Sequence, residues 1–122
     1  MLRLPWWFPY GRVPEIKPED LHARLRRGEP WQIVDVRQPL EYRGGHVRGA
    51  INLPINQFKR GYRDLRLDPS RPVAVICLTA HRSIPAVRFL RQEGFAAWQL
   101  AGGLLAWRAQ GLPEEKERDV ET

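Results

Sequence analysis

The segment VAVICLTAHRSIPAV, residues 73–87, decides what kind of fold this chain adopts. Its first five residues form an uninterrupted apolar run, which is typical of a strand that is covered on both faces. Pro85 has no N–H group and is tolerated in a helix only within the first turn, so we expect a helix to begin between Arg82 and Pro85. The segment therefore predicts a buried strand, a tight loop and a helix, the repeating unit of an α/β domain.

Strand and helix patterns alternate through the rest of the chain. Residues 18–27 begin with a proline and acidic residues, end with arginines and are followed by Gly28, which are start and stop signals of a helix. We expect further strands at residues 31–36, 50–53 and 95–100, and further helices at residues 55–66, 83–93 and 104–110. This order predicts an α/β domain with a mainly parallel sheet, whose functional loops gather beyond the carboxyl ends of the strands.

The chain of 122 residues is long enough for one domain with a proper core and too short for two ordinary ones. Residues 1–14 read as an arm, because four aromatic residues alternate with prolines that interrupt helices and central strands. We expect these rings to pack on the domain or on a second copy of it, and we expect a monomer or a weak homodimer. Residues 15–113 form the domain, and residues 114–122 form a charged tail.

Composition excludes several classes of protein. The net charge of +6 comes from arginines spread singly or in pairs, without the concentrated patch of a nucleic-acid binder. No apolar run reaches the length of a bilayer span, and the amino terminus lacks the apolar core of a signal peptide, so we expect a cytoplasmic protein without membrane contact. One cysteine and three scattered histidines predict neither an internal disulfide nor a metal site.

The single cysteine, Cys77, lies at the predicted junction of strand and loop. The segment LTAHR, residues 78–82, would place backbone N–H groups at the start of a helix near the sulfur, and these groups, the helix dipole and Arg82 favour a thiolate over a thiol. The same groups would hold an anion. The alternative is that Cys77 is a small apolar residue that completes a buried strand. Its position at the end of the strand favours the reactive thiolate.

Three ordered motifs connect this loop with a known family. IVDVRQPLEYRGGHVRGAINLPI at 33–55, CLTAHRS at 77–83 and LAGGLLAWRAQGLP at 100–113 resemble the flanking signatures and active-site loop of the rhodanese-like sulfurtransferases. The resemblance implies a three-layer domain with a central five-stranded, mainly parallel sheet flanked by helices. It also implies that Cys77 takes sulfur from thiosulfate or a persulfide donor and passes it to cyanide or a thiol, with no metal or organic cofactor.

The resemblance makes the loop itself the candidate substrate-binding segment, namely Leu78, Thr79, Ala80, His81, Arg82 and Ser83. Arg82 is the best partner for an anion, although it could also serve as a structural ion pair. Ser83 could donate to a persulfide, but capping of the helix is the commoner role for a serine at this position. His81 is expected to be exposed.

Four residues of the first signature are candidates for support. Asp35 and Arg37 are the candidates for orienting the loop from behind. We assign Glu41 and His46 to the polar scaffold that fixes the strand ends, and we expect an ion pair between Arg37 and Glu41.

Two features of the loop refine this interpretation. Four residues separate Cys77 from Arg82, as in the sulfurtransferases, whereas phosphatases of similar fold have five, which disfavours a phosphatase or an arsenate reductase. Ala80 stands where the family commonly has glycine. We expect the backbone there to avoid positive φ, and the alternative is a slightly strained loop. A non-catalytic binding or regulatory module on the same fold is the remaining alternative to an enzyme.

Overall fold

A computed structural model describes residues 4–116 of the chain. Its centre is a five-stranded sheet with the order β1-β6-β5-β2-β4, in which every neighbouring pair is parallel. The strands are β1 (Glu15–Ile16), β2 (Gln32–Asp35), β4 (Ile51–Asn52), β5 (Val73–Ile76) and β6 (Ala97–Leu100). The predicted α/β class and mainly parallel sheet are confirmed.

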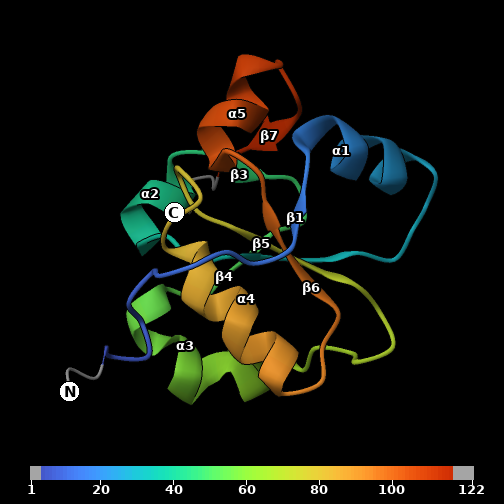
Figure 1. Ribbon diagram of the computed structural model, residues 1–122. Helices are drawn as coiled ribbons and strands as arrows, with labels where there is room; N and C mark the ends of the chain where they lie inside the picture. The colour runs from blue at the N-terminus through green and yellow to red at the C-terminus, as the bar shows by residue number, and fades with distance from the viewer. Residues whose placement is uncertain (1–3, 117–122) are drawn as a thin grey trace, which may run out of the picture.

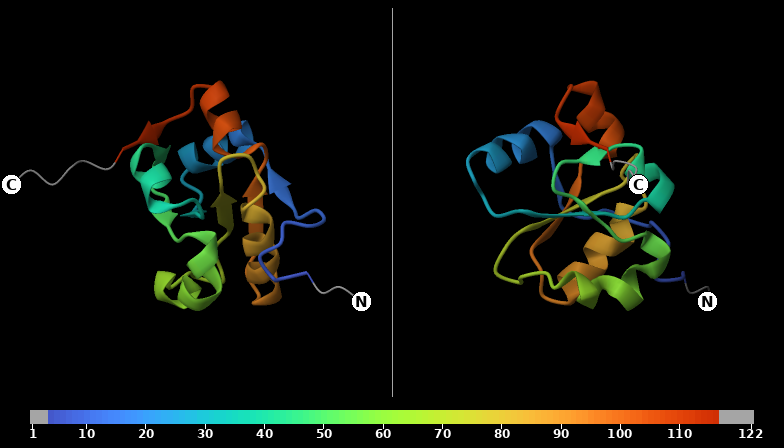
Figure 2. Two further views of the ribbon diagram at one scale, coloured as in Figure 1. Left: turned by 90° about the vertical axis from the view of Figure 1, so that its left-hand side faces the viewer. Right: turned by 180° about the vertical axis from the view of Figure 1, so that it is seen from behind.

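Helices cover both faces of this sheet and give the domain three layers (Figures 1 and 2). On one face lie α1 (Pro18–Arg26) and α5 (Gly103–Ala109), and on the other lie α3 (Ile55–Gly61) and α4 (Ser83–Gln92). A short helix, α2 (Pro39–Arg43), follows β2, and a 3₁₀ turn at Tyr62–Leu65 extends α3, in agreement with the irregular helix expected at residues 55–66.

The two faces of the sheet bury two apolar clusters. Alternate residues of β5 point to opposite faces: Ala74 and Ile76 pack with Leu21 of α1 and Trp107 of α5, whereas Val73 and Val75 pack against α3 and α4. All four β5 residues are buried, which is what the uninterrupted apolar run of this central strand predicted.

A second, two-stranded sheet joins the segment after α2 to the carboxyl-terminal end of the described chain. Its strands, β3 (His46–Val47) and β7 (Glu114–Glu115), are antiparallel. The expectation that residues 114–122 form a charged tail is therefore wrong for Glu114 and Glu115, because their backbone pairs with β3 and the Glu115 carboxylate accepts a hydrogen bond from the Gly49 N–H. Residues 117–122 of the expected tail lie outside the described part of the chain.

The described part of the arm packs along α4. Trp6 contacts Phe89 with 6.1 Å between ring centroids, and the Arg88 guanidinium lies 4.0 Å from the centre of the Tyr10 ring while donating a hydrogen bond to the Tyr10 carbonyl. These contacts confirm for Trp6 and Tyr10 that rings of the arm pack on the domain, whereas Trp7 and Phe8 are exposed. No helix among residues 4–116 is long and apolar enough to cross a membrane.

Candidate active site

Cys77 follows the last residue of β5, and α4 begins six residues later at Ser83, so the helix starts within the range that Pro85 predicted. The Cys77 side chain is only 1% exposed and packs with the cluster beneath α4. Its sulfur accepts a hydrogen bond from the backbone N–H of His81 at 3.1 Å. The loop therefore directs a backbone N–H group at the sulfur, as expected, and it also shields the sulfur from solvent.

The start of α5 supports the loop from behind. Leu104 N–H donates to the Cys77 carbonyl at 2.8 Å, and Leu105 N–H donates to the Leu78 carbonyl at 3.1 Å. The chain reaches this position through Gly103, whose φ is +66° and where a Cβ atom would lie 2.4 Å from the Leu78 carbonyl oxygen. Only glycine combines this backbone conformation with so close an approach.

Ala80 adopts a left-handed conformation, with φ of 65°. The expectation that residue 80 avoids positive φ is wrong, and the reason lies in the turn itself. Four residues must reverse the chain so that the His81 N–H points at the sulfur, and the left-handed conformation at residue 80 achieves that reversal. For a residue with a Cβ atom this conformation costs roughly 1–2 kcal/mol.

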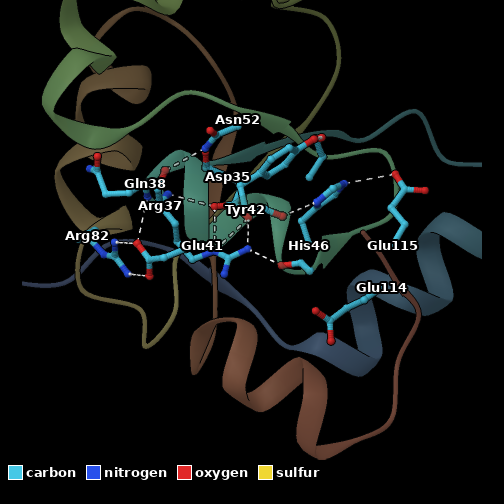
Figure 3. A network of polar contacts seen from close by, with 12 residues as sticks. Asp35, Arg37, Gln38, Glu41, Tyr42, His46, Asn52, Arg82, Glu114 and Glu115 are labelled. Atoms are coloured by element: carbon cyan, nitrogen blue, oxygen red, sulfur yellow. Dashed lines mark hydrogen bonds and ion pairs between the residues drawn. The ribbon is translucent and has the colours of Figure 1, made fainter. Parts of the chain in front are cut away.

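The ion pair at the loop joins Arg82 to Glu41, not Arg37 to Glu41 as expected (Figure 3). Arg82 donates from Nη1 to Oε1 at 2.6 Å and from Nη2 to Oε2 at 2.9 Å. This hydrogen bonding lowers the pKa of Glu41 to about 2 and raises the pKa of Arg82. Both side chains are 33% exposed, so the pair fastens the loop to α2 and still meets solvent.

Arg37 instead pairs with Asp35 in the interior. Its Nη2 donates to Asp35 Oδ2 at 2.9 Å and to the Gly45 carbonyl at 2.7 Å, and its Nε donates to Asp35 Oδ1 at 3.0 Å. The two side chains are 2% and 0% exposed. Asn52 on β4 donates to the carbonyls of both residues. The pair therefore fixes the turn that follows β2, immediately beside Glu41 (Figure 3).

His46 belongs to the scaffold, as expected. Its ring stacks on Tyr42 with 3.7 Å between centroids, and its Nδ1 lies 2.7 Å from the Tyr42 carbonyl oxygen. Its Nε2 lies 3.5 Å from a carboxylate oxygen of Glu115 (Figure 3). Among residues 4–116 no group of three or more His, Cys, Asp or Glu side chains is arranged to hold a metal ion.

Ser83 does not cap α4, which corrects the role favoured from the sequence. Its buried hydroxyl lies 3.3 Å from the Cys77 sulfur and donates to Gln99 Oε1 at 2.5 Å. Gln99 Nε2 in turn donates to the Glu15 carboxylate at 2.7 Å. Gln99 and Glu15 are absent from the sequence-derived candidates, although a glutamine inside the apolar strand at residues 95–100 was the available signal.

The remaining loop residues lie nearer the surface. Leu78 and Ala80 are half-buried, whereas Thr79 and His81 are exposed, as expected for His81. The Thr79 hydroxyl and His81 Nδ1 are 3.0 Å apart. All six predicted loop residues directly follow Cys77 in the sequence, but among the described residues the groups hydrogen-bonded to its sulfur are the Ser83 hydroxyl and the His81 N–H.

Comparison with known proteins agrees with this architecture. The family model of the rhodanese-like domain matches residues 17–110. A protein of Allochromatium vinosum named sulfurtransferase is 34% identical over 102 residues, which cover 83% of this chain and 94% of that protein.

Solved structures give the same result. A rhodanese-related protein of Thermoplasma volcanium superimposes with a TM-score of 0.78 at 30% identity and covers 86% of this chain and 100% of its own. The rhodanese-like domain of an Anabaena protein gives 0.75 at 35% identity, over 91% of this chain and 85% of that one. The fold, the position of the cysteine loop and these similarities together show that the chain belongs to the family of rhodanese-like domains.

Proposed function

We propose that the protein is a sulfurtransferase that moves sulfur from thiosulfate or a persulfide donor to a thiophilic acceptor through a persulfide on Cys77. The observation that carries the proposal is the hydrogen bond from the His81 N–H to the Cys77 sulfur in a loop between a strand and a helix amino terminus. Membership of the family and the relative named sulfurtransferase support the same reaction class.

The reaction divides into two displacements on sulfur. The Cys77 thiolate attacks the outer sulfur of thiosulfate, the S–S bond of the donor breaks, and sulfite leaves with the bonding electron pair. The Cys77 side chain then carries one additional sulfur atom as a persulfide. In the second step cyanide or a thiolate attacks that outer sulfur, and Cys77 leaves as the thiolate, ready for another cycle.

Each loop residue has a proposed part in this cycle. The backbone of residues 78–82 holds the anionic donor, and the outward side of the Arg82 guanidinium, which is partly exposed beside Glu41, attracts it. The Ser83 hydroxyl, 3.3 Å from the sulfur, orients the nucleophile. Asp35 and Arg37 act indirectly, because their ion pair fixes the turn that positions Glu41 against Arg82.

One observation favours a second candidate, a non-catalytic binding module. The Cys77 side chain is 1% exposed, and a nucleophile must be reached by its substrate. The sulfurtransferase therefore requires the outer part of the loop, at Thr79 and His81, to admit the donor.

Intact mass measurement separates the two candidates. The reduced protein incubated with thiosulfate should gain the mass of about one sulfur atom, lose it again on addition of cyanide, and gain nothing in the Cys77→Ser variant. Ser70→Ala, a change in an exposed side chain outside the cysteine loop, serves as the control that retains the thiol. An unchanged mass at every pH at which the protein remains folded would instead favour the binding module.

A further inference from the structure

A pocket lies between the arm and the cysteine loop. Trp6 and Trp7 of the arm form one wall, Ile55 at the start of α3 forms another, and His81 and Arg82 of the loop form the end. The pocket has a volume of about 420 Å³, within the range of sites for small organic molecules. We call it the arm pocket.

The walls of the arm pocket are held in place by the domain. Trp6 contacts Phe89 on α4, and the Lys59 ammonium lies 5.7 Å from the centre of the Trp6 ring. Trp7, in contrast, is 54% exposed. One indole is thus fixed on α4 while the neighbouring indole presents an uncovered apolar surface to whatever enters the pocket.

The polar end of the pocket adjoins the loop that covers the Cys77 sulfur. His81 is one of the residues that line the pocket, and its backbone N–H is bonded to the Cys77 sulfur. An occupant that places an apolar group against the indoles therefore has its other end at the cysteine loop. Thiosulfate and cyanide are small and polar, and neither would use an apolar wall built from two tryptophans.

We propose that the arm pocket binds the apolar group of an organic sulfur acceptor, a small thiol that carries an aromatic ring or a branched alkyl group. This inference rests on the proposed function and names the acceptor class for it. The acceptor thiolate attacks the outer sulfur of the Cys77 persulfide and forms a new S–S bond. The bond between that sulfur and Cys77 breaks, Cys77 leaves as the thiolate, and the product is an organic persulfide.

Binding can be measured without turnover. In the Cys77→Ser variant, benzyl thiol should shift the indole N–H resonances of Trp6 and Trp7, and saturation of the shift gives the affinity. Trp7→Ala in the same background should weaken binding about tenfold, the effect of losing part of one aromatic contact. Phe8→Ala is the matched control, because Phe8 is the next residue of the same arm, is 40% exposed and does not line the pocket.

The transfer step gives an independent readout. Protein loaded with thiosulfate is discharged with benzyl thiol or with 2-mercaptoethanol, and the loss of one sulfur atom is followed by mass. The ratio of the two rate constants should fall about tenfold in Trp7→Ala and keep its wild-type value in Phe8→Ala. Within one protein, the ratio cancels any general effect of the substitution on the reactivity of the persulfide. Comparison of the ratio between proteins cancels the intrinsic difference in reactivity between the two thiols.

The outcomes distinguish this inference from the proposed function. Equal ratios in wild type and Trp7→Ala, or indole resonances that do not move with benzyl thiol, would overturn the arm pocket as an acceptor site. Failure to load any sulfur refutes the proposed function, and the binding measurement then decides alone whether the pocket takes an apolar thiol. Resonances that shift with protein concentration would show that a second copy of the chain occupies the pocket, and would also overturn the inference.

Discussion

Two segments leave neighbouring parallel strands at the same edge of the sheet, and each contains an arginine paired with a carboxylate. Residues 35–41 begin at the last residue of β2 and hold the Asp35–Arg37 pair within the segment, with 0% and 2% of the side chains exposed. Residues 77–82 follow β5 and reach across to the first segment through the Arg82–Glu41 pair, with both side chains 33% exposed.

The same chemical pair serves different purposes in the two places. Removal of one partner from a buried pair leaves an uncompensated charge in the interior, whereas a partly exposed pair exchanges its partner for water at little cost. The first segment is therefore a fixed support. The second segment is held by an ion pair that a charged substrate can replace. A loop that binds such a substrate can therefore adjust its position.

Stability of single variants tests this contrast with the largest expected effect. Asp35→Ala strands the buried Arg37 guanidinium and should lower the free energy of unfolding by about 3–5 kcal/mol. Glu41→Ala, the matched change in the other pair, should lower it by at most about 1 kcal/mol. Urea titration of the three proteins gives both values. Equal losses would mean that exposure does not separate the two pairs.

Acid titration tests the exposed pair alone. The pKa of Glu41 is about 2 in the folded protein, lowered from 4.5 chiefly by hydrogen bonding to Arg82, so its contribution to stability is complete above about pH 4.5 and is lost as the pH falls through 2. At neutral pH the free energy of unfolding of the wild type should exceed that of Glu41→Gln by at most about 1 kcal/mol, because solvent screens this partly exposed pair. Urea midpoints measured at decreasing pH should converge, and a constant difference would show that Glu41 acts through packing.

Of the two segments, only the second contains a residue with positive φ, Ala80, and relief of its backbone strain gives the smallest expected effect. Ala80→Gly removes a left-handed conformation that costs roughly 1–2 kcal/mol but makes the unfolded chain more flexible by about 0.4–1 kcal/mol, so the net gain should be about 0.5 kcal/mol. Arg66→Gly is the control, because Arg66 has φ of 51° outside the site. Thermal midpoints should rise alike in both variants. A loss of stability in Ala80→Gly alone would indicate that the alanine methyl group is needed for packing of the loop.

Local rules predicted the elements that local sterics control. Pro85 indicates the start of α4, because a residue without an N–H group is excluded from every position of a helix after the first turn. The run at 73–77 identified a central strand because apolar side chains on both faces require cover on both faces. The lone cysteine between these elements was therefore placed correctly at the strand end from the sequence.

The ion-pair and hydrogen-bond partners of the site residues could not be predicted in the same way. Glu41 is bonded to Arg82 rather than to Arg37 because α2 presents it to a loop 41 residues away, a distance in sequence that no local pattern encodes. Ser83 turns from the helix end to Gln99 because β6 lies beside β5, which depends on the strand order of the whole sheet. The glycine usual at position 80 did carry the signal for positive φ, and the expectation failed by discounting it.

The hydrogen bonds from α5 to the loop orient peptide groups beside Cys77, and this affects the reorganisation energy of the proposed reaction. The carbonyl oxygens of Cys77 and Leu78 are bonded to Leu104 and Leu105 behind the loop, so these two peptide dipoles are already oriented before any substrate arrives. In the proposed sulfur transfer, water around a free thiolate would have to reorganise as the negative charge is redistributed, whereas peptide groups held at their carbonyl oxygens are already oriented. Gly103, which permits the close contact between α5 and the loop, would then lower the reorganisation energy of the reaction without touching sulfur or substrate.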